Sequence, residues 1–288
     1  MEKLKITDVR AVPGDSAFLI DDGKTAVLYD TGFAFTGFQV AENIQKELGE
    51  RPLDYIFLTH SHYDHALGSA YIVKRYPNVK VVAGAYAEKI FAKPSARATM
   101  RELDKTFAKT CGVFDYEDLI DELRVDISVN DGDEIEAGDM RFTVINLPGH
   151  TRCSVGYYLP ESKLLLGSET LGVYFSDGTI LPSYLIGYKT TLESIKKVEA
   201  LDIEHILLPH FGLLNQEQTA YFLKEAKQVA VRVAEEIKQV LASGGTKEEA
   251  AKYFEDKYYL DHVKPTYPEA AFRLNTGIMV NLVANELL

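Results

Sequence analysis

The feature that most constrains the fold is the alternation of short strand-like runs with helical segments. Strand-like runs fill the first part of the chain and return after residue 124, and segments of helical composition separate them in both parts. Two early runs, at 16–20 and 25–29, flank the turn signal Asp22-Gly23, which is typical of a β-hairpin. This order predicts an α/β or layered α+β core rather than an all-β sandwich.

The predicted elements form a mixed core followed by helices. Strands are predicted at 5–12, 16–20, 25–29, 55–58, 79–82, 124–129, 133–136, 141–145, 155–159, 163–166 and 205–208, and helices at 38–49, 66–75, much of 84–123, 189–201 and 269–287. Apolar residues then recur every three or four positions from Phe222 to Val240, which predicts a helix over 216–242. We expect one domain over residues 1–212 and a helical C-terminal extension over 213–288.

Charge and cysteine content limit the partners and the compartment. The chain carries 31 Lys and Arg against 43 Asp and Glu, a net charge of −12, which argues against a nucleic acid partner. Two cysteines in 288 residues cannot form a disulfide scaffold, so a reducing compartment is favoured. The N-terminus lacks an apolar leader, and no window is apolar enough to span a membrane. We expect a cytoplasmic protein that binds neither nucleic acid nor membrane.

Metal-binding side chains gather directly after the apolar run at 55–58. His60, His62, Asp64 and His65 lie within six positions, where a strand gives way to a helix. Because His60 and His62 are two residues apart, their rings can point to the same side at a strand end. Neutral imidazoles and a carboxylate suit borderline divalent metals such as zinc. The run therefore predicts a metal site.

Two further histidines follow predicted strands elsewhere in the chain. His150 stands at the exit of the Pro148-Gly149 turn, and His210 follows the apolar run at 205–208. Strand ends at one edge of an α/β sheet converge on one site, so we expect both rings to join the first cluster. His205 precedes its strand, and we interpret it as structural.

In this order the motifs resemble the metallo-β-lactamase superfamily over roughly residues 5–212. The resemblance implies a four-layer αββα sandwich with metals at the edge between the two sheets. It also implies that His60, His62 and His150 hold a first metal and that Asp64, His65 and His210 hold a second. The Asp30-Thr31-Gly32 turn is similar to the first motif of the family, in which the aspartate is usually structural.

One position departs from the family pattern. The resemblance calls for an aspartate that bridges the two metals after the strand at 163–166, and the matching residue here is Glu169. Its extra methylene shifts the carboxylate oxygens by roughly 1.5 Å, the length of one C–C bond. We expect Glu169 to be a ligand, either bridging both metals or binding only one. A structural role outside the ligand set is the alternative.

The resemblance implies a hydrolase with two divalent transition-metal ions, zinc first, with iron or manganese as alternatives. A hydroxide between two such ions would attack a small ester, lactone or thioester. Asp64 beside the metals would pass a proton to the leaving group. The expected partner is a small-molecule substrate.

Two other activities of the same family remain open. A mononuclear non-haem iron site of His60, His150 and Glu169 would resemble the sulfur (persulfide) dioxygenases. A phosphodiesterase acting on a small substrate is the second alternative. A metal-free scaffold is disfavoured by the complete histidine set.

Substrate contacts and assembly have weaker sequence signals. Tyr174, Tyr184 and Tyr188 cluster after Glu169, where they would supply an aromatic wall and a phenolic hydrogen-bond donor to a substrate. Ordinary packing of these rings is the alternative. The apolar stripe of the 216–242 helix would cover its own core or form a homodimer.

Overall fold

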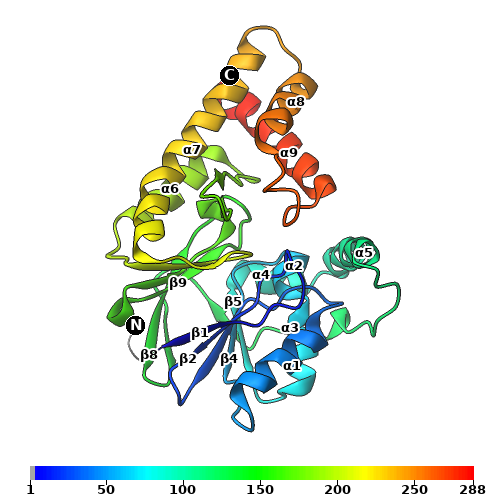
Figure 1. Cartoon of the computed structure of the whole chain (residues 1–288), viewed down its shortest axis with the longest axis vertical. Coiled ribbons are helices and arrows are strands. Elements are labelled where there is room, and N and C mark those ends of the chain that lie inside the picture. Colours follow the sequence, from blue (N-terminus) through cyan, green and yellow to red (C-terminus); the bar gives the residue numbers. More distant parts are fainter. Residues whose placement is uncertain (1–3) are drawn as a thin grey trace. The chain divides into compact units, whose positions relative to one another are not determined.

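The computed structural model describes residues 4–288, and the chain forms two compact units (Figure 1). The first unit runs up to Asn146 and also includes Val155–Leu166, whereas the second consists of Leu147–Ser154 and Gly167–Leu288. Residues 1–3, on which part of the prediction about the N-terminus rests, lie outside the described residues. The units follow packing in space rather than chain order, and the domain boundary after residue 212 stays a prediction.

A six-stranded sheet forms one layer of the first unit, in the order β1-β2-β3-β4-β5-β6. The strands β1 to β3 pair antiparallel through hairpins, and β3 to β6 pair parallel. Parallel pairing requires crossovers, which the helices between these strands provide. The strands are β1 (Lys5–Asp8), β2 (Phe18–Asp21), β3 (Ala26–Tyr29), β4 (Tyr55–Phe57), β5 (Lys80–Gly84) and β6 (Ile127–Val129).

An antiparallel sheet in the order β10-β9-β8-β7 forms the second layer of this unit. Its strands are β7 (Glu134–Ala137), β8 (Met140–Asn146), β9 (Val155–Leu159) and β10 (Leu164–Leu166). Aromatic rings join the two layers: the Phe57 ring centroid lies 4.6 Å from that of Tyr157 and 5.1 Å from that of Phe142. The Tyr157 hydroxyl donates a 2.8 Å hydrogen bond to the carbonyl of Leu58. The apolar core of the unit therefore lies between the sheets.

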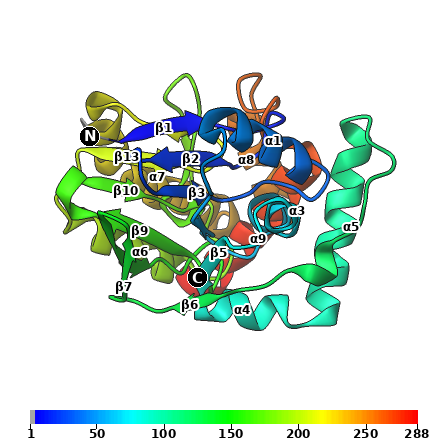
Figure 2. The same ribbon diagram turned by 90° about the horizontal axis from the view of Figure 1, so that it is seen from below.

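Helices cover the outer face of the first sheet. Figures 1 and 2 show α1 and α3 side by side on that face, and the two helices pack against each other. Pro94 begins α5, a position where its missing N–H costs nothing. The helices of this unit are α1 (Gly37–Leu48), α2 (Tyr63–Ala66), α3 (Gly68–Arg75), α4 (Ala85–Phe91) and α5 (Pro94–Thr110), with the 3-10 turns η1 (Ile120–Glu122) and η2 (Pro160–Ser162).

The second unit is mainly helical. Its helices are α6 (Tyr188–Glu199), α7 (Gln216–Ala242), α8 (Lys247–Tyr258) and α9 (Glu269–Leu287), and α9 packs on α7 and α8 (Figure 1). It also contains the 3-10 turn η3 (Glu169–Leu171) and the hairpins β11 (Val173–Tyr174)–β12 (Ile180–Leu181) and β13 (His205–Leu208)–β14 (Gly212–Leu213). Capping boxes begin α7, at Asn215, and α8, at Thr246.

Most predicted elements are confirmed. The helix over 216–242 begins and ends as predicted, whereas the strand predicted at 5–12 ends at Asp8 and the β11–β12 hairpin was not predicted. Among residues 4–288, no helix combines the length and apolar character needed to cross a bilayer.

Candidate metal centre

The predicted histidine run lies between β4 and α2 in the first unit. His62 has extended backbone angles (φ −70°, ψ 153°) and immediately precedes α2, which carries Asp64 and His65. The ring centroid of His60 lies 4.6 Å from that of His62 and 4.1 Å from that of His65. The His65 Nε2 atom lies 3.8 Å from Oδ2 of Asp64. The short spacing in sequence therefore becomes a compact cluster of ligand-type side chains.

A buried carboxylate, Asp30, stands behind this cluster. Its Oδ2 atom lies 2.7 Å from Nδ1 of His65, and it accepts hydrogen bonds from the backbone and hydroxyl of Thr59. The Thr59 hydroxyl in turn lies 2.9 Å from Nδ1 of His60. A carboxylate only accepts hydrogen bonds when ionised, so Nδ1 of His65 donates to Asp30, and Nε2 is the ring nitrogen that is left to bind a metal.

Backbone strain accompanies this arrangement. Asp30 has a φ of 54°, in the left-handed region that costs a non-glycine residue free energy. The strain is offset by the hydrogen bonds of its buried side chain to Ser16, Thr59 and His65. The aspartate of the Asp30-Thr31-Gly32 turn thus has the structural role that its family motif implies, and it also orients a candidate ligand.

In the second unit, the Glu169 carboxylate lies between two histidines. Its Oε2 atom lies 2.8 Å from Nε2 of His150, and its Oε1 atom lies 3.6 Å from Nε2 of His210. Glu169 begins η3, directly after Ser168. His210 has a φ of 62°, which is a strained backbone for histidine. The structure therefore brings these three predicted ligands together.

The other ring nitrogen of His150 faces Ser183. Nδ1 lies 2.8 Å from the Ser183 hydroxyl oxygen and 3.1 Å from the Ser183 carbonyl oxygen. A carbonyl oxygen only accepts, so Nδ1 donates to Ser183, and Nε2 is the ring nitrogen that faces Glu169 and could bind a metal. Nothing in the sequence pointed to Ser183, because it lies 33 residues from His150 and serine is common in loops.

Imidazole Nε2 atoms and carboxylate oxygens form the donor set that suits borderline divalent ions. Both units contain such groups. Their buried Nδ1 contacts fix the ring orientations, as the outer partners of metal-binding histidines do. The residues therefore fit a metal, and their individual ligand roles stay predictions.

The three tyrosines predicted to line a substrate site are buried within the second unit. The Tyr174 ring lies 4.7 Å from that of Phe211, and the rings of Tyr184 and Tyr188 lie 5.5 Å apart. Burial raises the pKa of all three phenols. Within residues 4–288, the Tyr184 hydroxyl has no hydrogen-bond partner. Contact with a substrate stays a prediction for these residues.

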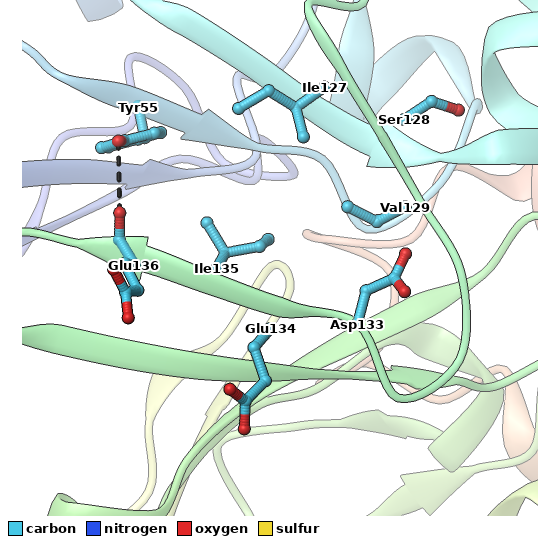
Figure 3. Close-up of a pocket in the computed structure, with 8 residues that line it drawn as sticks. All are labelled: Tyr55, Ile127, Ser128, Val129, Asp133, Glu134, Ile135 and Glu136. Atoms are coloured by element: carbon cyan, nitrogen blue, oxygen red, sulfur yellow. Dashed lines mark hydrogen bonds between the residues drawn. The ribbon is translucent and has the colours of Figure 1, made fainter.

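A separate cavity of about 340 Å³ lies in the first unit, between β6 and β7 (Figure 3). The Tyr55 hydroxyl closes one end by donating to the carbonyl of Glu136. The lining is Tyr55, Ile127, Ser128, Val129, Asp133, Glu134, Ile135 and Glu136. It contains none of the predicted site residues.

Comparison with known proteins relates the chain to one superfamily. The family model described as "Metallo-beta-lactamase superfamily" matches residues 12–210. The chain is 26% identical over 180 residues to the metallo-beta-lactamase fold-containing protein ST1585 of Sulfurisphaera tokodaii, which covers 60% of this chain and 66% of that protein. It is 33% identical over 119 residues to a hydroxyacylglutathione hydrolase of Brucella anthropi, which covers 41% of this chain and 34% of the relative.

The chain thus spans about two thirds of one of these relatives and about one third of the other. Among solved structures, the metallo-beta-lactamase family protein TTHA1429 of Thermus thermophilus superimposes with a TM-score of 0.64 at 18% identity, covering 99% of this chain and 94% of that one. This likeness confirms the predicted fold class, including the helices that follow the core.

Proposed function

Because this chain belongs to the metallo-beta-lactamase superfamily, whose members are typically hydrolases, we propose that it is a metal-dependent hydrolase of a small ester, lactone or thioester. The observation that carries the proposal is the anchoring of the candidate ligands: Nδ1 of His60, His65 and His150 each lies within 3.1 Å of an oxygen. In metal-binding histidines one ring nitrogen is typically held by an oxygen in this way while the other binds the metal. Histidines that serve only as packing residues do not require such an anchor.

We propose that the chain binds two divalent ions, zinc in the first place. The proposed ligands are His60, His62 and His150 for one ion, Asp64, His65 and His210 for the other, and Glu169 for both. When bound, such ions would lower the pKa of a water molecule and polarise the acyl oxygen of a substrate.

The position of the Glu169 carboxylate supports a role as a ligand to both proposed ions. Its two oxygens face different histidines, at 2.8 Å and 3.6 Å. A carboxylate with each oxygen near a different histidine can contribute one oxygen to each ion. The extra methylene relative to aspartate is therefore compatible with a bridging role.

Asp64 is the proposed proton carrier. Its side chain is 23% exposed, so it can exchange protons with solvent, whereas the His65 side chain beside it is fully buried. Of the candidate carboxylates in the first unit, Asp30 is committed to Thr59 and His65. Proton transfer to a leaving group consequently falls to Asp64 in this proposal.

The substrate class is narrowed by the relatives. One of them carries the name hydroxyacylglutathione hydrolase, and a hydroxyacylglutathione is a thioester. We therefore place thioesters first among the substrates, followed by lactones and small esters. The two cysteines in 288 residues support a reducing compartment, and we propose the cytoplasm.

The test combines metal content with turnover. Purified protein should hold between one and two transition-metal ions per chain and hydrolyse at least one member of a panel of thioesters, lactones and phosphodiesters. His62→Ala should lower the turnover number at least a hundredfold, whereas the control His205→Ala, at the start of β13, should leave it within a factor of two.

Three outcomes would contradict the proposal. A protein that cannot be loaded with metal defeats it. Full activity of His62→Ala defeats the ligand assignment. One iron per chain with oxygen uptake on glutathione persulfide would establish the dioxygenase alternative instead.

A further inference from the structure

The carboxylate of Glu286, near the end of α9, caps the N-terminus of α6. Its Oε1 atom accepts a 3.0 Å hydrogen bond from the backbone N–H of Tyr188, and its Oε2 atom accepts a 3.0 Å bond from that of Lys189. We propose that Glu286 is a positioning residue for His150, acting through α6. This inference rests on the proposed function, in which His150 is a metal ligand.

The first turn of α6 depends on this distant residue. The N-cap position is Gly187, which has no side chain to accept a hydrogen bond, and the first turn contains no acidic residue. The N–H groups of a first helical turn have no partner within the helix. Glu286 satisfies two of them and places a negative charge at the positive end of the helix dipole.

The helix α6 in turn holds the Pro148-Gly149 turn. The Ser194 hydroxyl donates a 2.6 Å hydrogen bond to the carbonyl of Pro148. Gly149 has a φ of +152°, and a Cβ atom built on it would lie 2.3 Å from Oγ1 of Thr191. The turn therefore packs so closely on α6 that no side chain fits between them, and a shift of α6 must move the turn.

The segment just before α6 completes the support of His150. The backbone N–H groups of Leu185 and Ile186 both donate 2.9 Å hydrogen bonds to the carbonyl of Gly149. Ser183, two residues earlier, contacts Nδ1 of the His150 ring. Residues 183–194 thus contact both the Pro148-Gly149 turn and the His150 ring. Glu286 binds this segment near its middle, at Tyr188 and Lys189.

The test measures Zn²⁺ affinity, by competition with a chromophoric chelator, in full-length wild type and variants. Removal of an outer partner of a metal ligand typically weakens metal binding ten- to a hundredfold. We expect Glu286→Ala to weaken Zn²⁺ binding at least tenfold and to alter the visible spectrum of the Co²⁺-loaded protein. Glu286→Gln keeps one acceptor oxygen and should fall between Glu286→Ala and wild type.

The matched control is Thr246→Ala, which removes a capping hydrogen bond from α8 without touching residues 183–194. It should lower thermal stability by a similar amount and leave Zn²⁺ affinity unchanged. Wild-type affinity in both Glu286 variants would overturn the inference while the proposed function stands. Equal weakening in Thr246→Ala would overturn it as well, because the effect would then be one of general stability.

Two results separate the inference from its premise. A wild-type chain that binds no Zn²⁺ contradicts the proposed function itself. If Glu286→Ala does not fold, Glu286→Gln carries the test alone, and an unchanged affinity in that variant overturns the positioning role.

Discussion

Asp104, on α5, is a fully buried carboxylate that should destabilise the folded chain when it is ionised. Its Oδ1 atom accepts a 2.8 Å hydrogen bond from the backbone N–H of Ala34, and the Tyr116 hydroxyl donates to its Oδ2 atom. Burial raises the pKa of Asp104 from 3.8 to about 6, and the nearby charge of Asp15 adds to this, although the hydrogen bonds oppose it. The folded state therefore favours the protonated acid.

The sign of the pH effect follows from proton binding. Between pH 3.8 and about 6 the folded chain binds more protons at Asp104 than the unfolded chain, so the free energy of unfolding falls as the pH rises through this window. A pKa difference of about two units corresponds to about 3 kcal/mol. Asp104→Asn imitates the protonated acid, so at pH 8 it should be more stable than wild type by up to about 3 kcal/mol.

The assay is urea unfolding of dilute protein, followed by circular dichroism, at pH 8.0 and pH 4.3. The gain in Asp104→Asn should be up to about 3 kcal/mol at pH 8.0 and should fall to about 1 kcal/mol or less at pH 4.3. The control is Asp118→Asn. Burial acts to raise the pKa of Asp118, but the 2.6 Å hydrogen bond from Arg101, the backbone hydrogen bond from Ile120 and the charges of Arg101 and Lys105 together hold that pKa below its usual range.

Asp118→Asn should therefore lose up to about 1 kcal/mol at pH 8.0, the opposite sign. A loss of more than 1 kcal/mol in Asp104→Asn at pH 8.0 would refute the reasoning. It would mean that the ionised carboxylate stabilises this part of the fold.

Three further outcomes are expected from the same structure. Gly68→Ala should lower the free energy of unfolding in urea titrations by about 3 kcal/mol or more, because the new Cβ would lie 2.0 Å from the carbonyl oxygen of Thr31. Gly277→Ala is the control: its Cβ would meet open space, so the same titration should show a gain of up to about 1 kcal/mol. Tyr184→Phe removes a buried hydroxyl without a partner within residues 4–288 and should keep or slightly raise the melting temperature. Chelation of bound metal should lower the melting temperature measured by calorimetry, and added Zn²⁺ should restore it. If the free ion had been present at a thousand times its dissociation constant, its removal costs about 4 kcal/mol of stability.

The histidine cluster of the first unit could be predicted from sequence because its residues are close in the chain. His60, His62 and His65 leave one strand end within six positions, and local geometry alone gathers their rings. The Asp30-Thr31-Gly32 turn was also visible as a motif. Its contact with His65, 35 residues away, depends on the parallel pairing of β3 with β4.

The residues that support His150 could not be predicted in the same way. Ser183 and Glu286 lie 33 and 136 positions from His150, and neither has a local pattern that distinguishes it from a loop serine or a helix carboxylate facing solvent. The strained backbone of Asp30 and His210 is equally invisible, because residue type predicts positive φ reliably only for glycine. Long-range packing decides these features.

For Glu169, the fold adds information that the sequence alone does not contain. From sequence, the extra methylene left open whether Glu169 bridges two metals, binds one metal or has a structural role. In the folded second unit the side chain places one oxygen 2.8 Å from Nε2 of His150 and the other 3.6 Å from Nε2 of His210. An aspartate on the same backbone would withdraw both oxygens by roughly 1.5 Å. These contacts support the proposal that Glu169 is a ligand despite its difference from the aspartate of the family pattern.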